Sequence, residues 1–217
     1  MNPVTLERLN QKLQLADQLL AGRATMLEPQ DLPGRYGRVI RAVDHLLGIT
    51  QIEAVLGGGW AVWFHGYAGR VTQDLDVALP ADRIEEFLQS AAVSGFELLA
   101  RQEGRWPKMI HKETRIQVDI LPEGARPGTP SRPAPTTIPH PSRMGASIGR
   151  LRYINLPCLI ELKIAAGRAR DHGDIVELLR VNADQAAGIR QHLAEVHPDY
   201  VKVLDELERA AREQQDP

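Results

Sequence analysis

The stretch Gly58–Asp76, GGWAVWFHGYAGRVTQDLD, decides the fold of this chain. A glycine turn at its start follows the β-prone run Ile52–Leu56, and an apolar helical segment then leads to a strand that carries Asp74 and Asp76. Because side chains alternate along a strand, these two carboxylates point to one face of it. Mg²⁺ prefers oxygen ligands and binds through one or two carboxylates together with phosphate oxygens. The stretch therefore predicts a metal and nucleotide site.

A second acidic strand is predicted at Arg115–Leu121, where apolar residues alternate with Gln117 and Asp119. An aspartate in such an apolar run is costly to bury without a partner or an ion. If this strand lies beside the first, Asp119 points towards the same metals. The alternative is a carboxylate at the strand end that faces solvent.

The glycines Gly57, Gly58 and Gly59 separate the run Ile52–Leu56 from the helical segment that begins near Trp60. Glycine permits a positive φ and a close approach of backbone to a ligand, and free N–H groups at a helix start suit phosphate oxygens. A plain strand-to-helix turn is the alternative. Fifteen residues separate Gly59 from Asp74, which favours a phosphate cradle that faces the metal site.

The predicted fold class is α+β, a small mixed β-sheet core with flanking N-terminal helices and a C-terminal helical bundle. The sheet would take its strands from 52–56, 74–79, 96–101, 107–111 and 115–121, with a helix at 82–93. Four regions are expected: N-terminal helices (1–50) packing on the core, the core (51–122), a Pro-rich loop region (123–155) and a C-terminal helical region (156–217). Seven prolines in 122–141 predict an extended, irregular loop that lies over the site.

Bulk composition describes an ordinary soluble protein. The chain has 217 residues, 43% of them hydrophobic and 25% charged, and a formal net charge of −2, which does not suggest a dedicated nucleic-acid binder. Residues 101–152 nevertheless hold ten Lys/Arg and four Asp/Glu, so this stretch carries 10 − 4 = +6. It would attract a triphosphate or RNA, or be a solvated face. No run suits a membrane span or a signal peptide, so a cytoplasmic protein is expected.

Other chemistry-bearing residues are expected to be structural. The single cysteine, Cys158, lies in an apolar helical run and is read as a small core residue in a reducing compartment. His111, His140 and His172 lack metal-ligand spacing, so no zinc site is predicted. His65 and the aromatic residues Trp60, Trp63 and Phe64 are interpreted as packed residues rather than ligands or a base-stacking shelf.

The string G-G-x-A-x-x-x-H-G followed by R-x-T-x-D-L-D-V resembles the signature of the DNA polymerase β-like nucleotidyltransferase superfamily. It covers Gly58 to Val77 here. Leu156-Pro157-x-Leu159, Lys163 and the run from Gly167 to Leu178 are similar to the helical tail of its minimal and AbiEii-type toxin branch. Together these motifs span about residues 52–180.

The resemblance implies transfer of a nucleoside monophosphate from an NTP to an acceptor, with release of pyrophosphate. It implies that Asp74, Asp76 and Asp119 hold Mg²⁺, two ions being expected, and that Asp119 also deprotonates the acceptor. The predicted nucleotide-binding residues are Gly58, Gly59, Arg70, Thr72, Lys163 and Arg168.

Several alternatives stay open from the sequence. The acceptor could be tRNA, a protein or a small molecule, and a toxin of a toxin–antitoxin pair would also have an antitoxin partner. A catalytically inactive module that binds nucleotide or a partner protein is the alternative function. Arg168, Asp171 and Asp174 could equally form a structural ion-pair network, since Arg168 and Asp171 are i, i+3 neighbours on a helix.

Overall fold

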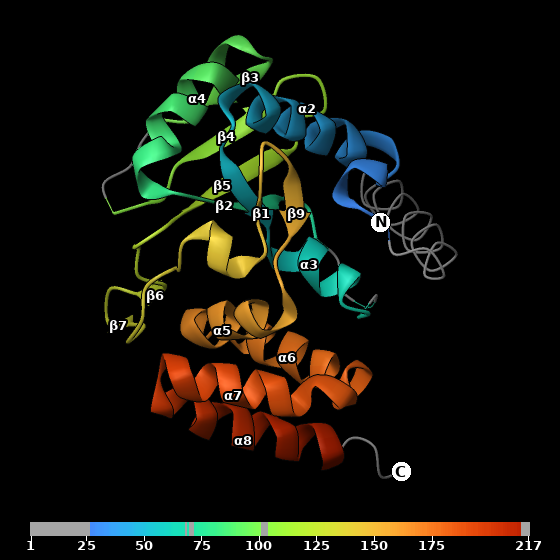
Figure 1. Cartoon of the computed structure of the whole chain (residues 1–217), viewed down its shortest axis with the longest axis vertical. Coiled ribbons are helices and arrows are strands. Elements are labelled where there is room, and N and C mark those ends of the chain that lie inside the picture. Colours follow the sequence, from blue (N-terminus) through green and yellow to red (C-terminus); the bar gives the residue numbers. More distant parts are fainter. Residues whose placement is uncertain (1–26, 68, 70–71, 101–103, 214–217) are drawn as a thin grey trace, which may run out of the picture.

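The computed structural model describes residues 27–67, 69, 72–100 and 104–213. A mixed sheet lies between two layers of helices (Figure 1). This confirms the predicted fold class for the sheet, the N-terminal helix α2 and the C-terminal bundle. The first predicted helix, within residues 1–26, lies outside the described residues, and so does Arg70.

The sheet has the strand order β3-β4-β5-β2-β1-β8, and β9 pairs in parallel with β1. At its centre β2 runs parallel to β5 and antiparallel to β1. The expected strands all form, with ends shifted by up to three residues, and β8 and β9 are additions that the sequence did not predict. The strands are β1 (Glu53–Leu56), β2 (Leu75–Leu79), β3 (Phe96–Leu98), β4 (Lys108–His111), β5 (Gln117–Pro122), β8 (Ser147–Ile148) and β9 (Leu151–Tyr153).

The helices follow the predicted apolar periodicity. They are α2 (Gly34–Thr50), α3 (Gly58–Phe64), α4 (Ile84–Val93), α5 (Leu156–Ala166), α6 (Ala169–Val181), α7 (Ala186–Val196) and α8 (Pro198–Glu213). The Asn155 side chain accepts a hydrogen bond from the Cys158 backbone N–H and so caps α5. Gly167 ends α5 in the left-handed conformation, with φ of 63°. Short 3₁₀ turns lie at Pro29–Asp31, Ala81–Arg83, Pro141–Met144 and Ala183–Gln185.

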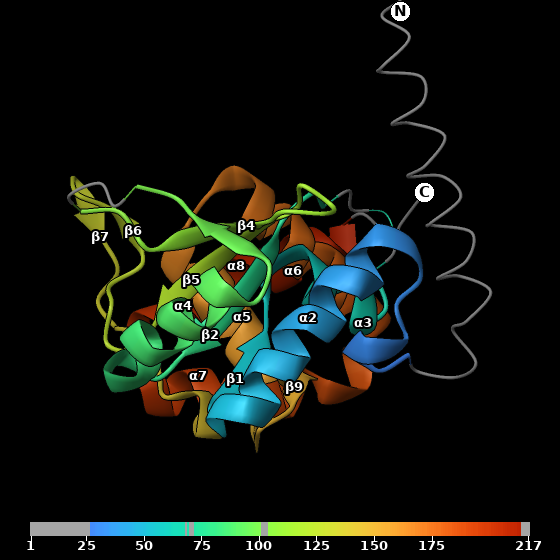
Figure 2. The same cartoon turned by 90° about the horizontal axis from the view of Figure 1, so that it is seen from above.

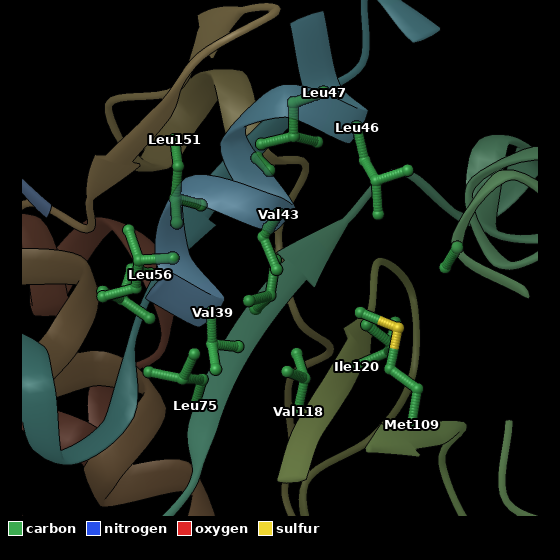
Figure 3. Packing of buried hydrophobic residues seen from close by; sticks show 14 of the residues in the cluster. Val39, Val43, Leu46, Leu47, Leu56, Leu75, Met109, Val118, Ile120 and Leu151 are labelled. Carbon is green, nitrogen blue, oxygen red and sulfur yellow. The ribbon is translucent and has the colours of Figure 1, made fainter. Parts of the chain in front are cut away.

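Helices α2 and α4 cover one face of the sheet. Val39 and Val43 of α2 pack on the strand residues Leu75 and Val118 (Figure 3). All four side chains are fully buried, and burying each of them contributes roughly 1.5–3 kcal/mol. This face is therefore closed to solvent and carries no chemistry.

The C-terminal helices lie on the other side of the sheet from α2 and α4, with α5 and α6 nearer the sheet and α7 and α8 beyond them (Figure 1). Figure 2 shows the same arrangement from above. Val55 and Ala78 are buried on this side against the α5–α8 core. Asp76 is two residues from Ala78, so its side chain points to the same side. The alternation along β2 thus separates a packing face from a polar face.

The Pro-rich segment is more regular than the sequence suggests. It forms the hairpin β6 (Gly128–Thr129) and β7 (Arg132–Pro133). Ile138 is buried and donates its backbone N–H to the Ala125 carbonyl. Proline fits here because hairpin turns and two-residue strands need few N–H donors.

No helix in the described part of the chain is long and apolar enough to cross a bilayer.

Candidate functional site

A cavity of about 630 Å³ opens between the polar face of the sheet, helix α5 and the β6–β7 hairpin. It gathers residues from widely separated parts of the sequence. Its charged lining residues are Asp74, Asp76, Arg105, Lys108, Asp119, Arg126, Lys163, Arg168, Arg170 and Asp171.

Asp76 and Asp119 are direct neighbours across the central parallel pair of strands, β2 and β5. Residues opposite one another in a sheet point to the same face. Both carboxylates therefore face the cavity, as the sequence predicted they would if the strands were adjacent. Asp74 lies one residue before β2 and also lines the cavity.

Thr72 positions Asp74 from within the same turn. Its hydroxyl donates to Asp74 Oδ1 at 3.3 Å, and the Tyr36 hydroxyl donates to the Thr72 carbonyl at 3.4 Å. Thr72 is not among the residues that line the cavity. Its contact with the site in this structure passes through the Asp74 carboxylate.

Gly58 occupies a position that only glycine fits. Its φ is +57°, and a Cβ added there would lie 1.7 Å from Asp76 Oδ2. The adjacent Gly57 donates its N–H to the Asp76 carbonyl at 2.8 Å. The glycine turn and the acidic strand are thus in direct contact, and Gly58 lines the cavity. Gly59 is buried in the first turn of α3 and does not line it.

Two side chains donate hydrogen bonds to the Asp119 carboxylate. Lys108 Nζ donates to Asp119 Oδ2 at 2.7 Å, and Gln117 Nε2 donates to Oδ1 at 2.6 Å. Lys108 pairs with Asp119 in register from β4, so three side chains in a row across β2, β5 and β4 face the cavity. The Lys108 ammonium group offsets part of the negative charge of the neighbouring carboxylates Asp76 and Asp119.

The donor set suits a hard cation, because all three aspartates offer carboxylate oxygens to one cavity. Asp74 and Asp76 are two residues apart, and Lys108 forms its ion pair with Asp119. In the described residues the three aspartates do not close to within 4.8 Å of one another. Asp74, Asp76 and Asp119 are the residues that would hold a divalent ion here, and Asp119 would have to give up its ion pair with Lys108 to bind it.

Replacing Lys108 with methionine should lower the half-saturating Mg²⁺ concentration about fivefold, because an ammonium that competes for Asp119 is removed. The change corresponds to about 1 kcal/mol, as expected of a partly exposed ion pair. The measurement is Mg²⁺-dependent nucleotide binding or turnover. Lys202→Met removes a similar lysine–aspartate pair on α8 and should leave the Mg²⁺ dependence unchanged. An unchanged or raised Mg²⁺ requirement in Lys108→Met would contradict the competition.

Lys163 reaches the cavity from α5 as a buried cation, with 5% of its side chain exposed. It donates to Asp171 and to Asp174, both on α6. Arg168 donates from Nε and Nη2 to the two oxygens of Asp171. The ion-pair network considered from the sequence is therefore present. Two of its cations, Lys163 and Arg168, and the carboxylate Asp171 also line the cavity.

The network orients positive charge towards the carboxylates of β2. The hydrogen bond from Arg168 to Asp171 raises the pKa of Arg168, and the charges of Asp76 and Asp74 act in the same direction. Burial opposes the charged form of Asp171, yet its pairing with Arg168 and Lys163 outweighs this and leaves the pKa of Asp171 lowered. Both groups stay charged at neutral pH.

The lowered pKa of Asp171 predicts acid lability. A carboxyl group with a folded pKa below its unfolded value near 3.9 stabilises the protein above that value, and the stability is lost as pH falls through the folded pKa. Asp171→Asn should cost about 3 kcal/mol at pH 7 and flatten the fall in unfolding free energy below about pH 4. Urea unfolding at several pH values measures both effects. The control is Asp82→Asn, on the exposed 3₁₀ turn before α4, and an equally steep acid limb in Asp171→Asn would contradict the assignment.

Several lining residues were not identified from the sequence. Arg105, Trp106 and Lys108 lie around the start of β4, and Arg126 precedes the β6–β7 hairpin. The +6 charge of residues 101–152 was the available signal, but it did not tell which cations face inward. That information depends on strand register and on the fold of the hairpin.

Residues expected to pack do so. Trp60 is 1% exposed, and its ring lies 4.8 Å from that of Tyr36. Phe64 stacks on Tyr153 with ring centroids 4.3 Å apart. His65 Nε2 lies 2.8 Å from the Ile154 carbonyl oxygen, and burial lowers the pKa of His65. None of these residues lines the cavity.

No protein-family model matches this chain, and no curated protein matches it. Two solved structures are similar. A crystal structure of ANT(2")-Ia in complex with adenylyl-2"-tobramycin is 17% identical, with 82% of this chain and 97% of that chain covered and a TM-score of 0.43. A solution structure of the antibiotic-resistance factor ANT(2'')-Ia is 17% identical, with 82% and 91% covered and a TM-score of 0.46. A similarity of this size carries no inference about activity.

Proposed function

We propose that this chain is a Mg²⁺-dependent nucleotidyltransferase that moves a nucleoside monophosphate from an NTP to a hydroxyl group of a small molecule. The observation that carries the proposal is the cavity in which Asp74, Asp76 and Asp119 meet Gly58, Lys163 and Arg168. The superfamily resemblance of the motifs around Gly58 and Asp76 supports it. Phosphoryl transfer depends mainly on positioning and charge stabilisation, and this cavity supplies both.

In the proposed reaction the acceptor oxygen bonds to the α-phosphorus, and the bond between that phosphorus and the β-phosphate oxygen breaks. Bound Mg²⁺ would neutralise charge on the triphosphate. Asp74 and Asp76 would bind the metal ion, and Asp119 takes the proton of the acceptor hydroxyl. Lys163 and Arg168 face the leaving pyrophosphate. Arg70 stays a proposed nucleotide-binding residue on the strength of the motif alone, and Thr72 is proposed to orient Asp74.

The distribution of basic residues favours a small acceptor over RNA. Arg105, Lys108 and Arg126 line the cavity, where they suit a triphosphate. Arg115 and Arg152 are paired with Glu97 and Glu28. Five of the ten basic residues of this stretch thus lie in the cavity or in local ion pairs, which leaves fewer of them for a surface that binds a polyanion.

The test is incubation of the purified protein with Mg²⁺ and NTPs labelled at the α-phosphate. Three acceptor pools are compared: small hydroxylated compounds including aminoglycosides, total tRNA, and protein. Label should move to the small-molecule pool and should be lost in Asp74→Asn. Transfer of label to tRNA or to protein would show that the acceptor is a macromolecule instead of a small molecule. NTP binding without turnover against any pool would favour the inactive binding module.

The AbiEii-type toxin reading proposes the same chemistry with a cellular macromolecule as acceptor and an antitoxin as partner. It predicts that expression slows growth and that Asp76→Ala relieves the effect. Normal growth of cells that express active enzyme would remove this reading and leave the small-molecule reaction in place.

A further inference from the structure

A second cluster of reactive side chains lies away from the carboxylate cavity, between α5 and α7. Cys158 and Glu161 are one turn apart on α5, and His192 faces them from α7. His192 Nε2 lies 2.7 Å from Glu161 Oε2 and 3.9 Å from Cys158 Sγ. One ligand atom from each residue lies within 4.8 Å of the other two. Cys158 and Glu161 are 2% and 3% exposed.

The geometry excludes a Cys–His–Glu nucleophilic triad. In such a triad the acid binds one imidazole nitrogen while the other faces the thiol. Here the carboxylate and the thiol both approach the same nitrogen, Nε2. Burial and the Glu161 charge also raise the pKa of Cys158 to about 11, which is opposite to the shift of a nucleophilic thiol. Three ligand atoms that converge on one point are instead the arrangement of a metal site.

A cavity of about 480 Å³ adjoins the cluster. Besides the three residues it is lined by Thr136, Thr137, Arg143 and Glu195. Glu195 follows His192 by three residues on α7 and adds a further carboxylate. Arg143 offsets part of this negative charge, and its charge acts to lower the pKa of the thiol. A fourth coordination position would open into this space, where water or Glu195 can supply the ligand.

We propose that Cys158 Sγ, Glu161 Oε2 and His192 Nε2 form a site for a divalent transition-metal ion of the zinc class. Thiolate and imidazole ligands favour such ions over Mg²⁺. Bonds of about 2.0–2.3 Å in a tetrahedral site place ligand atoms roughly 3.3–3.7 Å apart. The 2.7 and 3.9 Å separations reach those values with movements below about 1 Å. On binding, the thiol releases its proton and the sulfur bonds to the ion.

The site would connect three parts of the fold. Cys158 and Glu161 belong to α5, whose opposite side brings Lys163 to the carboxylate cavity. His192 belongs to α7 of the C-terminal bundle, and the adjoining cavity is bordered by the Pro-rich segment through Thr136 and Thr137. A bound ion would therefore fasten α7 to α5, the helix that supports the carboxylate cavity. The proposal does not depend on the proposed transfer reaction.

In the experiment the whole 217-residue chain is freed of metal with a chelator and then titrated with Co²⁺ alone. Cys158 is the only cysteine of the chain, so a thiolate-to-cobalt charge-transfer band can come from no other residue. The band should saturate at about one equivalent and disappear in Cys158→Ser. The apparent affinity for Co²⁺ should fall at least tenfold in His192→Gln and in Glu161→Gln. Zn²⁺ should displace Co²⁺ from the site, so that the band disappears. At a hundredfold excess over its Kd, Zn²⁺ should also raise Tm by about 5 °C.

Asp76→Asn is the control, because it changes the carboxylate cavity and leaves the three proposed ligands intact. The Co²⁺ band should be unchanged in this variant. His192 is 24% exposed in its side chain, so His192→Gln tests the site with little risk to folding, which circular dichroism checks. Absence of a band in the wild-type protein would overturn the proposal. A band that neither His192→Gln nor Glu161→Gln weakens would also overturn it, because it would report a thiol that binds metal alone.

Discussion

Replacing Gly58 with alanine should reduce nucleotidyl transfer by on the order of a thousandfold while the protein stays folded. The added Cβ would lie 1.7 Å from Asp76 Oδ2 and 2.6 Å from Asp76 Cγ. The strain is relieved by turning the Asp76 carboxylate away, and this withdraws a proposed metal ligand from the cavity. Loss of several kcal/mol of charge stabilisation corresponds to that fall in rate.

The stability cost of Gly58→Ala should be smaller, about 1–2 kcal/mol, since a non-glycine residue at φ +57° enters the left-handed region. Gly34→Ala is the matched control. Its φ is +63°, and a Cβ there meets nothing within 4 Å. Gly34→Ala should show a similar stability loss with full activity. Comparable activity in the two variants would contradict the contact between Gly58 and Asp76 as the cause.

Replacing Asp76 with asparagine should have a comparable effect on turnover through charge alone. The amide keeps the shape of the side chain but removes the negative charge that neutralises a divalent ion. Turnover should fall on the order of a thousandfold, and Mg²⁺ should no longer stabilise the protein–NTP complex in a thermal shift assay.

Asp82→Asn on the exposed 3₁₀ turn before α4 removes an equal charge outside the cavity and should leave both readouts unchanged. Wild-type turnover in Asp76→Asn would disprove a metal role for this carboxylate. Retained Mg²⁺ stabilisation together with lost turnover would assign Asp76 to the reaction instead of to binding.

The sequence predicted the helices and strands well, because each is specified by a pattern of residues close together in the chain. The spacing of Val39, Val43 and Leu46 along α2 specifies a helix with one buried face. The alternation around Asp76 and Asp119 specifies strands with one polar face. The Pro-rich segment was less predictable, because hydrogen bonds such as Ile138 N–H to Ala125 O pair residues thirteen apart.

The site was predictable only in part, because some of its contacts join residues that are far apart in the sequence. The carboxylates and Gly58 lie in one motif or in an obviously acidic strand, so their types and spacing identify them. Lys108 meets Asp119 only through the register of β4 on β5. A shift by one residue would turn Lys108 to the other face of the sheet, and residue types alone do not determine that register.

By itself the sequence determined an α+β chain with a glycine turn and two strands that carry the three aspartates, because periodicity and turn chemistry act over a few residues. Tertiary structure alone decided which cations face those aspartates. It also brought Cys158 and His192 together, thirty-four residues apart, from two helices that pack side by side. The physical reason is that helix packing and strand register depend on many weak contacts distributed over the whole chain.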